Sequence, residues 1–394
     1  MKKCNKKSAL VVGGSNGIGL AITSLLLEKG YYVYIIDMVE PDTAFLKEND
    51  DFTFIRTNLA EFNEECFKEI IKDESIEILM ITAGFGKVAK FENLEYFEIE
   101  NQFKVNTLAV IHIIKMFYEK INRKDKFYTG IMVSICGIIS SPLFSSYSAS
   151  KAALTKFIEA INIELEKSGT TNRILDVSPG SLKGTKFNTG NNNDLNQIKD
   201  IAQNIIEKMK NSETNYIPDY DNIYKGVIER YISNPHKFGL ESYEYKIKNN
   251  REDNKRRYTV GYLSGTFDLF HIGHLNLLKK AKEQCSYLIV GVHPSAAHKG
   301  KETFIPFDER KEIVRSCKYV DKVIDSLPED SDVWNLYKYD KLFVGSDYKG
   351  TERFNNYEKY FSDKNVEIIY FPYTKSTSST QIRNLIINKI DSSK

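Results

Sequence analysis

Residues 10–21 read LVVGGSNGIGLA, and this stretch decides the fold of the first part of the chain. The apolar run before its first glycine predicts a buried strand, and the apolar residues after it predict a helix. Glycines at such a junction allow a tight turn and a close backbone approach to a pyrophosphate, which the helix N-terminus stabilises. We therefore expect a dinucleotide to bind Gly13, Ser15, Asn16, Gly17, Ile18 and Gly19.

Asp37 supports this interpretation because it ends the next predicted strand, YYVYIID at residues 31–37. An acid at that position can bind both ribose hydroxyls and repel a 2′-phosphate, so NAD is favoured over NADP. The alternative is an Asp that only ends a strand.

Apolar runs alternate with amphipathic stretches from Ala9 to about Val177, which predicts an α/β fold, a Rossmann doubly wound parallel sheet. The alternation begins again at Tyr258 and predicts a smaller Rossmann-like α/β domain. Residues 236–257 are charged and without pattern, so we expect domains at 1–235 and 258–394 joined by a linker at 236–257. Residues 190–221 are Asn-rich around a helical core, which suggests a flap over a substrate pocket or, alternatively, a plain surface helix.

Composition limits the classes of partner. The 394 residues include 55 Lys+Arg and 53 Asp+Glu, a net charge of +2, so no overall basic field favours nucleic acid or an anionic membrane. The five cysteines are widely spaced without CxxC, which argues against a disulfide framework or a zinc site. No segment approaches the roughly 18 apolar residues of a spanning helix. We expect a cytoplasmic protein with small-molecule partners and no resident metal.

The sequence YSASK places Tyr147 and Lys151 on one face of a predicted helix. A free phenol has a pKa of about 10, and a nearby ammonium lowers it by stabilising the phenolate. Tyr147 can then give a proton to a carbonyl oxygen while hydride arrives at carbon. Ser134, at the end of GIMVS, is placed to hydrogen-bond the same oxygen.

With these motifs the chain resembles the short-chain dehydrogenase/reductase family over residues 7–235. The resemblance implies a catalytic tetrad, Asn106, Ser134, Tyr147 and Lys151, in which Lys151 also holds the nicotinamide ribose. Among the departures from the family pattern, Asn58 stands where an Asp often contacts adenine. Further cofactor-binding residues implied by the resemblance are Asn58, Ala83, Gly84, Pro179, Gly180 and Thr185.

A second motif, GTFDLFHIGH at residues 265–274, follows a predicted strand and opens a helix. The helix N-terminus and imidazole donors can stabilise charge that develops on phosphates, so a triphosphate suits this turn. Zinc is disfavoured because no third ligand lies near His271 and His274.

This segment resembles the HxGH nucleotidyltransferases, and more closely their glycerol-3-phosphate cytidylyltransferase branch, over residues 258–390; PFDER at 306–310 is a companion motif. The resemblance implies that a substrate phosphate attacks the α-phosphorus of CTP with Mg²⁺ present. His271 and His274 would stabilise the transition state, Lys299 would bridge substrate and α-phosphate, and a serine and threonine cluster would hold the outer phosphates. The nucleotide-binding residues so implied are Gly265, Thr266, Phe267, His271, His274, Lys299, Gly345, Asp347, Ser378, Ser379 and Thr380.

Two departures, Tyr348 and Tyr373, leave substrate fit and base choice less defined than the reaction type, and CTP is favoured over ATP by the resemblance. We expect a bifunctional enzyme that reduces a keto or aldehydo sugar phosphate with NAD(P)H and joins CMP to the resulting polyol phosphate. The CDP-polyol would serve surface polysaccharide or teichoic-acid-like polymers. Alternatives are an adenylyltransferase second domain, or a nucleotide sensor with one inactive domain. A homo-oligomer, a dimer or tetramer, is expected.

Overall fold

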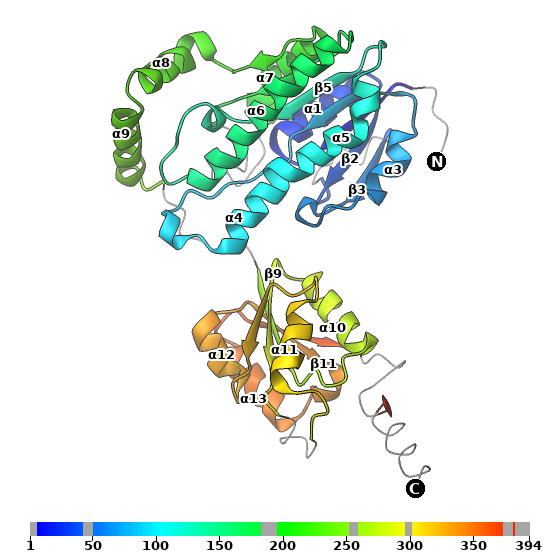
Figure 1. The fold of residues 1–394 in the computed structure, drawn as a ribbon, viewed down its shortest axis with the longest axis vertical. Coiled ribbons are helices and arrows are strands. Elements are labelled where there is room, and N and C mark those ends of the chain that lie inside the picture. Colours follow the sequence, from blue (N-terminus) through cyan, green and yellow to red (C-terminus); the bar gives the residue numbers. More distant parts are fainter. Residues whose placement is uncertain are drawn as a thin grey trace. The chain divides into compact units, whose positions relative to one another are not determined.

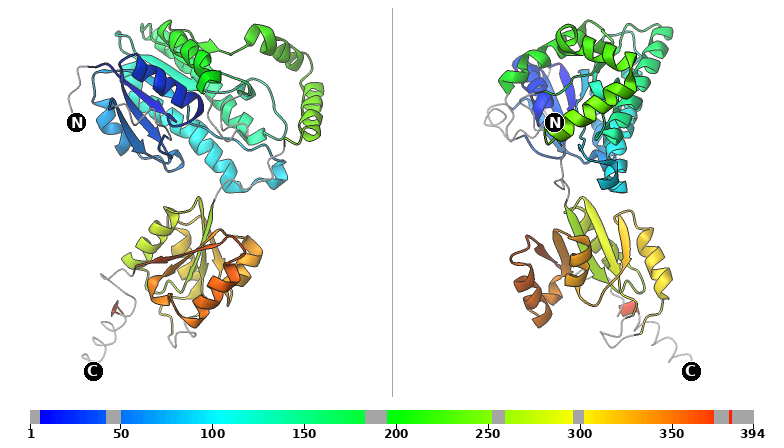
Figure 2. Two further views of the ribbon diagram at one scale, coloured as in Figure 1. Left: turned by 180° about the vertical axis from the view of Figure 1, so that it is seen from behind. Right: turned by 90° about the vertical axis from the view of Figure 1, so that its left-hand side faces the viewer.

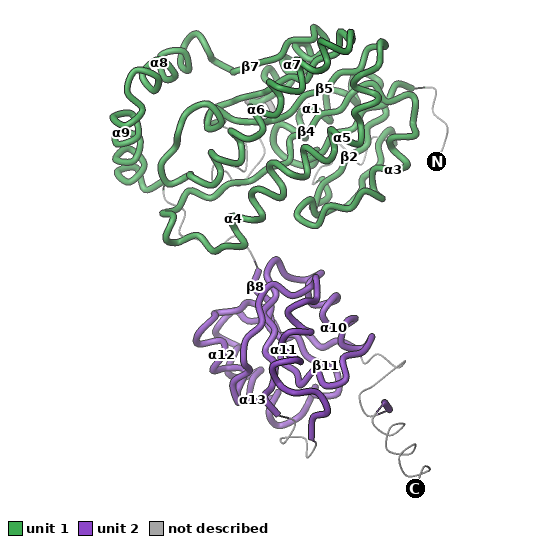
Figure 3. The backbone as a smooth tube through the Cα atoms, in the orientation of Figure 1, with its two compact units in different colours: residues 1–254 green, residues 255–394 purple. Residues whose placement is uncertain are grey.

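The computed structural model describes residues 6–41, 50–182, 195–251, 259–295, 302–372 and 381–382. The chain divides into two compact units, residues 1–254 and residues 255–394, which Figure 3 colours separately. Each unit contains its own parallel sheet with flanking helices, as the sequence pattern predicts.

Among the described residues of the first unit, seven parallel strands form one sheet in the order β3-β2-β1-β4-β5-β6-β7. The predicted Rossmann sheet is therefore confirmed, although the sequence analysis did not identify β3 or the two-residue β7. The strands are β1 (Ser8–Val12), β2 (Tyr32–Asp37), β3 (Phe52–Arg56), β4 (Ile76–Ile81), β5 (Tyr128–Met132), β6 (Ile174–Val177) and β7 (Asn215–Tyr216).

Helices cover both faces of this sheet (Figures 1 and 2). Successive residues of β1 point to opposite faces, so Leu10 packs with α5 and α6 while Val11 packs with α1 and α7. Among the described residues no helix combines the length and the apolar character needed to cross a membrane. The helices are α1 (Gly17–Glu28), α3 (Glu65–Ile71), α4 (Tyr96–Phe103), α5 (Ala109–Ile121), α6 (Ser145–Lys167), α7 (Leu195–Lys210), α8 (Lys225–Ser233) and α9 (Pro235–Lys248).

Helix α7 corrects both predictions for the Asn-rich stretch. Ile198, Ala202 and Ile205 are fully buried in the core that α7 shares with α1, so this helix is neither a flap nor a plain surface helix. Their spacing of four and then three residues forms one apolar stripe, which is the signal of a helix that packs on a core. Residues 183–194 lie outside the described part of the chain.

The expected linker at 236–257 begins instead as helix α9. Asn234 caps this helix by accepting a hydrogen bond from the Lys237 backbone nitrogen at 2.9 Å, and Pro235 occupies the first turn. Asparagine at the N-cap followed by proline is a helix start signal, which the charged composition of the stretch obscured. Helices α8 and α9 form an arm beyond β7 (Figure 1), and we use the word arm for these two helices.

Among the described residues of the second unit, five parallel strands form a sheet in the order β10-β9-β8-β11-β12. This is the smaller α/β domain that the sequence predicts. Its elements are β8 (Val260–Gly265), α10 (Ile272–Lys282), β9 (Tyr287–Val292), α11 (Phe307–Arg315), β10 (Lys322–Asp325), α12 (Asp330–Tyr337), β11 (Lys341–Gly345), α13 (Glu352–Phe361) and β12 (Glu367–Phe371).

The single tryptophan of the chain, Trp334, lies in α12. Its indole nitrogen donates a hydrogen bond to the carbonyl oxygen of Tyr339 at 3.1 Å. Its ring packs edge-on against Tyr360 and Phe361, whose centroids lie 6.2 and 6.1 Å away. Trp334 is therefore part of the packing that holds α12 against α13.

Candidate active sites

The glycine-rich turn between β1 and α1 leaves no room for side chains. Gly13 has φ +84°, and a Cβ there would lie 2.5 Å from the backbone nitrogen of Ala83. A Cβ on Gly19 would lie 2.0 Å from the carbonyl oxygen of Gly13, so strand and helix touch through bare backbone. Gly17, the first residue of α1, also has a positive φ of +52°. This geometry brings the helix N-terminus close to any phosphate group in the turn.

Asp37 lies against the same turn. Its Oδ2 accepts a hydrogen bond from the Ser15 backbone nitrogen at 3.1 Å, and its Oδ1 accepts one from the Met38 nitrogen at 2.7 Å. The Ser15 hydroxyl is buried and has no hydrogen-bond partner among the described residues. Asn16 occupies the N-cap of α1, and Ile18 is buried. A carboxylate at the strand end beside an orphaned hydroxyl fits the ribose and pyrophosphate of a nicotinamide dinucleotide.

Asn58 follows β3 and Ala83 follows β4, two strands that β2 and β1 separate in the sheet. The Ala83 nitrogen donates to the carbonyl oxygen of Val12 at 3.1 Å, which ties the loop after β4 to the end of β1. Asn58 caps a short helical turn, and its Oδ1 accepts a hydrogen bond from the Ala60 nitrogen at 3.1 Å. The Asn58 side-chain oxygen is thus engaged by the protein backbone.

The loop after β6 contains Pro179 and Gly180. A Cβ on Gly180 would lie 1.5 Å from the phenol oxygen of Tyr224, so only glycine permits this close approach. Tyr224 immediately precedes α8 and is a site residue that the sequence analysis missed, because no local motif marks it. Thr185 lies outside the described residues.

Tyr147 and Lys151 lie one turn apart on α6 and are 5% and 2% exposed. The ring of Phe144 stacks on Tyr147 with a centroid distance of 4.2 Å, and the Lys151 Nζ lies 5.8 Å from the centre of the Tyr147 ring. The Ser134 hydroxyl, just beyond β5, hydrogen-bonds the Tyr147 phenol. The Tyr147 phenol, the Lys151 ammonium and the Ser134 hydroxyl therefore lie close together.

Asn106 completes this group from a single π-helical turn between α4 and α5. Its Oδ1 accepts a hydrogen bond from the Phe85 nitrogen at 3.0 Å, and its Nδ2 donates to the Phe85 carbonyl at 2.9 Å. A Cβ on Gly84 would lie 3.2 Å from Asn106 Oδ1 and 3.1 Å from Lys151 Nζ, so both groups border this glycine. Such π-turns are frequent at functional sites because they displace one residue from the regular helix face.

Burial governs the electrostatics of this group. It lowers the pKa of Lys151 to about 8 and raises the pKa of Tyr147, so the lowering of the Tyr147 pKa that the sequence predicts is wrong for the protein without ligands. Lys151 Nζ donates a hydrogen bond to the carbonyl oxygen of Met132 at 2.8 Å. A buried phenol keeps its proton until an acceptor arrives, and a lysine of pKa near 8 exchanges protons near neutral pH. The arrangement suits protonation of a carbonyl oxygen.

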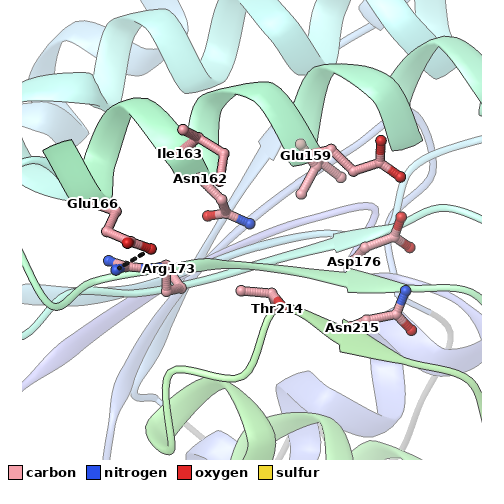
Figure 4. A pocket seen from close by; sticks show the side chains of 9 residues that line it. Glu159, Asn162, Ile163, Glu166, Arg173, Asp176, Thr214 and Asn215 are labelled. Carbon is pink, nitrogen blue, oxygen red and sulfur yellow. Dashed lines mark hydrogen bonds and ion pairs between the residues drawn. The ribbon is translucent and has the colours of Figure 1, made fainter.

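Asp176 on β6 is a further group that the sequence analysis missed. It is buried, interacts electrostatically with Lys151, and accepts a hydrogen bond from the Ser178 hydroxyl at 2.6 Å; burial raises its pKa. Its carboxyl reaches a pocket of about 430 Å³ between α6 and β6, which Glu159 and Asn215 also line (Figure 4). A carboxylate inside the apolar strand ILDV was the signal for this residue.

The turn between β8 and α10 contains Gly265, Thr266 and Phe267. Phe267 and Leu269 have φ values of +53° and +50°, which place two non-glycine residues in the left-handed region. The ring of Phe267 covers Gly265, where a Cβ would lie 2.9 Å from the ring. The Thr266 hydroxyl is buried without a hydrogen-bond partner among the described residues, which fits a contact to a bound nucleotide.

His271 and His274 stack at the start of α10 with a centroid distance of 4.0 Å. The Gly273 nitrogen donates to His271 Nδ1 at 3.0 Å, and the His271 nitrogen donates to His274 Nδ1 at 3.4 Å. An Nδ1 that accepts leaves the proton of a neutral imidazole on Nε2. Burial lowers the pKa of His271, which favours its neutral form.

Arg310 of the PFDER motif is fully buried, and its hydrogen bonds stabilise this turn. Its guanidinium donates to the Thr266 carbonyl, to the His293 and Pro294 carbonyls at 2.9 and 2.8 Å, and to the Ile305 carbonyl at 2.9 Å. One side chain therefore joins the turn after β8 to the segments after β9 and before α11.

Asp268 adds a second connection of the same kind. Its carboxylate accepts hydrogen bonds from the backbone nitrogens of Phe304 and Ile305 at 3.1 and 3.0 Å. Among the described residues no group of three His, Cys, Asp or Glu side chains is placed to hold a metal ion.

Gly345 and Asp347 lie where β11 ends, and β11 neighbours β8 in the sheet. The carboxyl ends of parallel strands meet at one sheet edge, so these residues share an edge with the GTFDLFHIGH turn. A Cβ on Gly345 would lie 2.4 Å from Asp347 Oδ1. The other predicted nucleotide-binding residues lie outside the described residues, namely Lys299, Ser378, Ser379 and Thr380.

Comparison with protein families matches residues 7–196 to the short chain dehydrogenases and residues 262–385 to the cytidylyltransferase-like proteins. The first segment contains the glycine-rich turn and the Tyr147 group, and the second contains the GTFDLFHIGH turn.

Individual relatives match one segment or the other. Dehydrogenase RED2 from Cochliobolus heterostrophus is 32% identical over 166 residues, 41% of this chain and 62% of that protein, so the chain spans less than two thirds of this relative. The reductase FabG of Buchnera aphidicola subsp. Schizaphis graminum, named for 3-oxoacyl-(acyl-carrier-protein), is 32% identical over 46% of this chain and 75% of its own length. Glycerol-3-phosphate cytidylyltransferase from Bacillus spizizenii is 35% identical over 30% of this chain and 90% of its own length.

Proposed function

Because the chain belongs to the short-chain dehydrogenases through residues 7–196 and to the cytidylyltransferase-like family through residues 262–385, we propose that it reduces a sugar phosphate and then joins CMP to the product. The fusion makes it an enzyme with an oxidoreductase and a nucleotidyltransferase part. The observation that carries the proposal is the presence of both site constellations on one chain.

In the reductase unit, the Tyr147 hydroxyl donates its proton to the carbonyl oxygen of the substrate, and the Ser134 hydroxyl hydrogen-bonds that oxygen. The nicotinamide cofactor supplies the hydride. Lys151 favours the phenolate that remains on Tyr147, and the nearby Asn106 helps to return a proton to it. The product is an alcohol, and a ketose or aldose phosphate becomes a polyol phosphate.

Asp37 supports NADH as the preferred cofactor. Its carboxylate lies at the end of β2 and contacts the Ser15 nitrogen, so a 2′-phosphate on the adenine ribose would meet a negative charge. We expect a lower KM for NADH than for NADPH.

In the transferase unit, a phosphate oxygen of the polyol phosphate attacks the α-phosphorus of CTP. The new P–O bond forms as the bond to the β-phosphate breaks, and pyrophosphate leaves with the electron pair. Nε2–H groups of His271 and His274 stabilise the charge on the transferring phosphate, and the buried Thr266 hydroxyl contacts the nucleotide. Mg²⁺ would accompany the triphosphate and neutralise part of its charge, and by family resemblance Lys299 and residues 378–380 would be further contacts.

The two reactions fit this order because reduction creates the acceptor that the second unit needs. Glycerol-3-phosphate cytidylyltransferase, a relative of the second unit, takes by its name a polyol phosphate. Fusion raises the local concentration of the intermediate. A CDP-polyol is an activated donor, and we propose cytoplasmic synthesis for a surface polysaccharide or teichoic-acid-like polymer.

The test uses the full chain with NADH or NADPH, CTP and Mg²⁺, and a panel of triose, pentulose and hexulose phosphates. We expect cofactor oxidation with at least one member and pyrophosphate release with the same member, with a CDP-polyol identified by mass spectrometry. ATP in place of CTP is the matched control, and release only with ATP would establish the adenylyltransferase alternative. Activity of only one unit with every member would support a sensor with one inactive domain.

A further inference from the structure

Lys246 of α9 is a half-buried lysine that the reductase mechanism does not use. Its Nζ donates hydrogen bonds to the Ser141 hydroxyl at 2.5 Å and to the Pro142 carbonyl oxygen at 2.6 Å. Neither acceptor carries a charge, and no carboxylate pairs with Lys246 among the described residues. By contrast, Lys87 in the loop after β4 is neutralised by Glu98 at 3.0 Å. Within the described part of the chain, Lys246 is therefore a partly desolvated cation without a carboxylate partner.

Lys246 is held by the turn at residues 141–144, which precedes α6, the helix that contains Tyr147 and Lys151. The Phe144 nitrogen donates to the Ser141 carbonyl at 3.0 Å, so the two ends of this turn are adjacent. Lys246 binds the Ser141 end, and Phe144 at the other end stacks on Tyr147.

Cys136 is a neighbour that these groups have in common. It is close enough to interact electrostatically with Lys246, with Tyr147 and with Lys151. The ammonium of α9 and the catalytic pair of α6 therefore border the same small region of the first unit.

The residue that leads into the arm makes a second contact near this region. Tyr224, directly before α8, has its phenol oxygen against Gly180 and accepts a hydrogen bond from the Ser181 backbone. Tyr224 thus touches the loop after β6, and Lys246 touches the turn before α6. The Ile135 nitrogen donates to the Pro179 carbonyl at 2.9 Å, so the loop after β6 lies beside the residue that follows Ser134.

An uncompensated charge in such a place costs free energy, because burial removes water without supplying an opposite charge. Burial accordingly lowers the pKa of Lys246. An ammonium has three N–H groups, and the two acceptors on the turn use two of them. An anion at the remaining N–H would restore the electrostatic balance.

We propose that Lys246 binds the phosphate group of the reductase substrate, which makes the arm the element that selects phosphorylated ketoses or aldoses. This inference rests on the proposed reduction of a sugar phosphate and names the residue that recognises it. The Tyr147 end of the region receives the carbonyl, and the Lys246 end receives the phosphate.

The test compares Lys246→Met with the wild-type full chain on a phosphorylated ketose and on its unphosphorylated counterpart. We expect the KM for the phosphorylated ketose to rise on the order of 10- to 100-fold, the range of one hydrogen bond to a charged group. The kcat/KM for the unphosphorylated counterpart should stay unchanged. Inorganic phosphate should inhibit the wild type competitively against the ketose phosphate and should lose this effect in Lys246→Met.

Two variants separate charge recognition from a structural role. Lys248→Met removes an exposed charge two residues further along α9 and should change neither KM. Lys246→Arg keeps the charge and should retain most of the preference for phosphate. Loss of activity toward both substrates in Lys246→Met, with Lys246→Arg equally impaired, would assign Lys246 to anchoring the arm and overturn the proposal.

Failure of the inference is distinguishable from failure of the proposed function. If the wild type prefers phosphorylated ketoses and Lys246→Met keeps that preference, Lys246 is not the phosphate contact while the function stands. If the wild type reduces only unphosphorylated carbonyls, the proposed substrate class and the inference both fail.

Discussion

The turn after β1 and the turn after β8 occupy equivalent places in the chain, since each follows the first described strand of its unit and opens a helix. The first is built from glycines, with Gly13 at φ +84° and Gly19 against the Gly13 carbonyl. The second places Phe267 and Leu269 at φ +53° and +50°, a conformation that costs a non-glycine residue about 1–2 kcal/mol.

The difference lies in what maintains each shape. The shape of the glycine turn depends on the lack of side chains at Gly13 and Gly19, which lie six residues apart. The second turn depends on hydrogen bonds from Arg310 to Thr266 and from the Phe304 backbone to Asp268, which span 44 and 36 residues. The first turn therefore depends on its own glycines, and the second depends on side chains that connect distant segments, so the two turns should respond differently to mutation.

The largest effect is expected for Tyr147→Phe, which removes the proton donor of the first site and leaves the second site intact. Reduction should slow on the order of 10²- to 10⁴-fold, the range of general acid catalysis. NADH oxidation and pyrophosphate release should be measured on the same sample, with a supplied polyol phosphate for the second assay. A parallel loss of pyrophosphate release would show that the sites are not independent.

His274→Ala tests the second site in the same way. Removing one donor to the phosphates should slow pyrophosphate release on the order of 10²- to 10³-fold. NADH oxidation should not change. His112→Ala is the matched control, because His112 packs edge-on against Phe62 in the first unit and belongs to neither site. Full transferase activity in His274→Ala would remove this histidine from the mechanism.

Arg310→Met and Gly19→Ala compare the two ways of holding a turn. Arg310→Met removes the donor of four carbonyl oxygens and should lower the free energy of unfolding of the second unit by about 3 kcal/mol. Gly19→Ala forces a methyl group against the Gly13 carbonyl and should destabilise the first unit by about 1–3 kcal/mol and raise the KM for NADH. Hydrogen exchange of each unit measures both changes. Destabilisation of the other unit in either variant would contradict the assignment.

The smallest effect concerns pH. Lys151 has a pKa of about 8 and carries its charge below that value, so the charge that favours the Tyr147 phenolate disappears as the pH rises through about 8. The kcat/KM for reduction should fall by about tenfold between pH 7 and pH 9, as expected for one proton. Pyrophosphate release should be insensitive over this range, because burial lowers the pKa of His271. A decline only near pH 10 would contradict the lowered pKa of Lys151.

The sequence predicted the parts of the molecule that local pattern determines. The glycine turn, the sheet of each unit and the face shared by Tyr147 and Lys151 follow from periodicity and spacing within about a dozen residues. The Asn106 position came from family resemblance, and the π-turn that presents its side chain to the site has no signal in the sequence FKVNTLA.

What the sequence did not predict depends on contacts between distant segments. Asp176 lies near Lys151 because β6 packs against α6. Tyr224 contacts Gly180 because the residues before α8 return to the loop after β6. Helix α9 was interpreted as a linker because its exposed, charged residues lack an apolar stripe, and α9 has no buried residue in the structure. Such contacts are set by the tertiary fold, which the spacing of residues in one segment does not record.

The location of the only tryptophan gives the second unit an optical label of its own. Trp334 packs between Tyr339, Tyr360 and Phe361, and the first unit contains no indole. Indole fluorescence excited at the red edge of the absorption band therefore reports unfolding of the nucleotidyltransferase unit alone, in the intact chain and without a probe. Comparing this signal with circular dichroism, which samples both units, resolves whether the fused domains unfold together or one after the other.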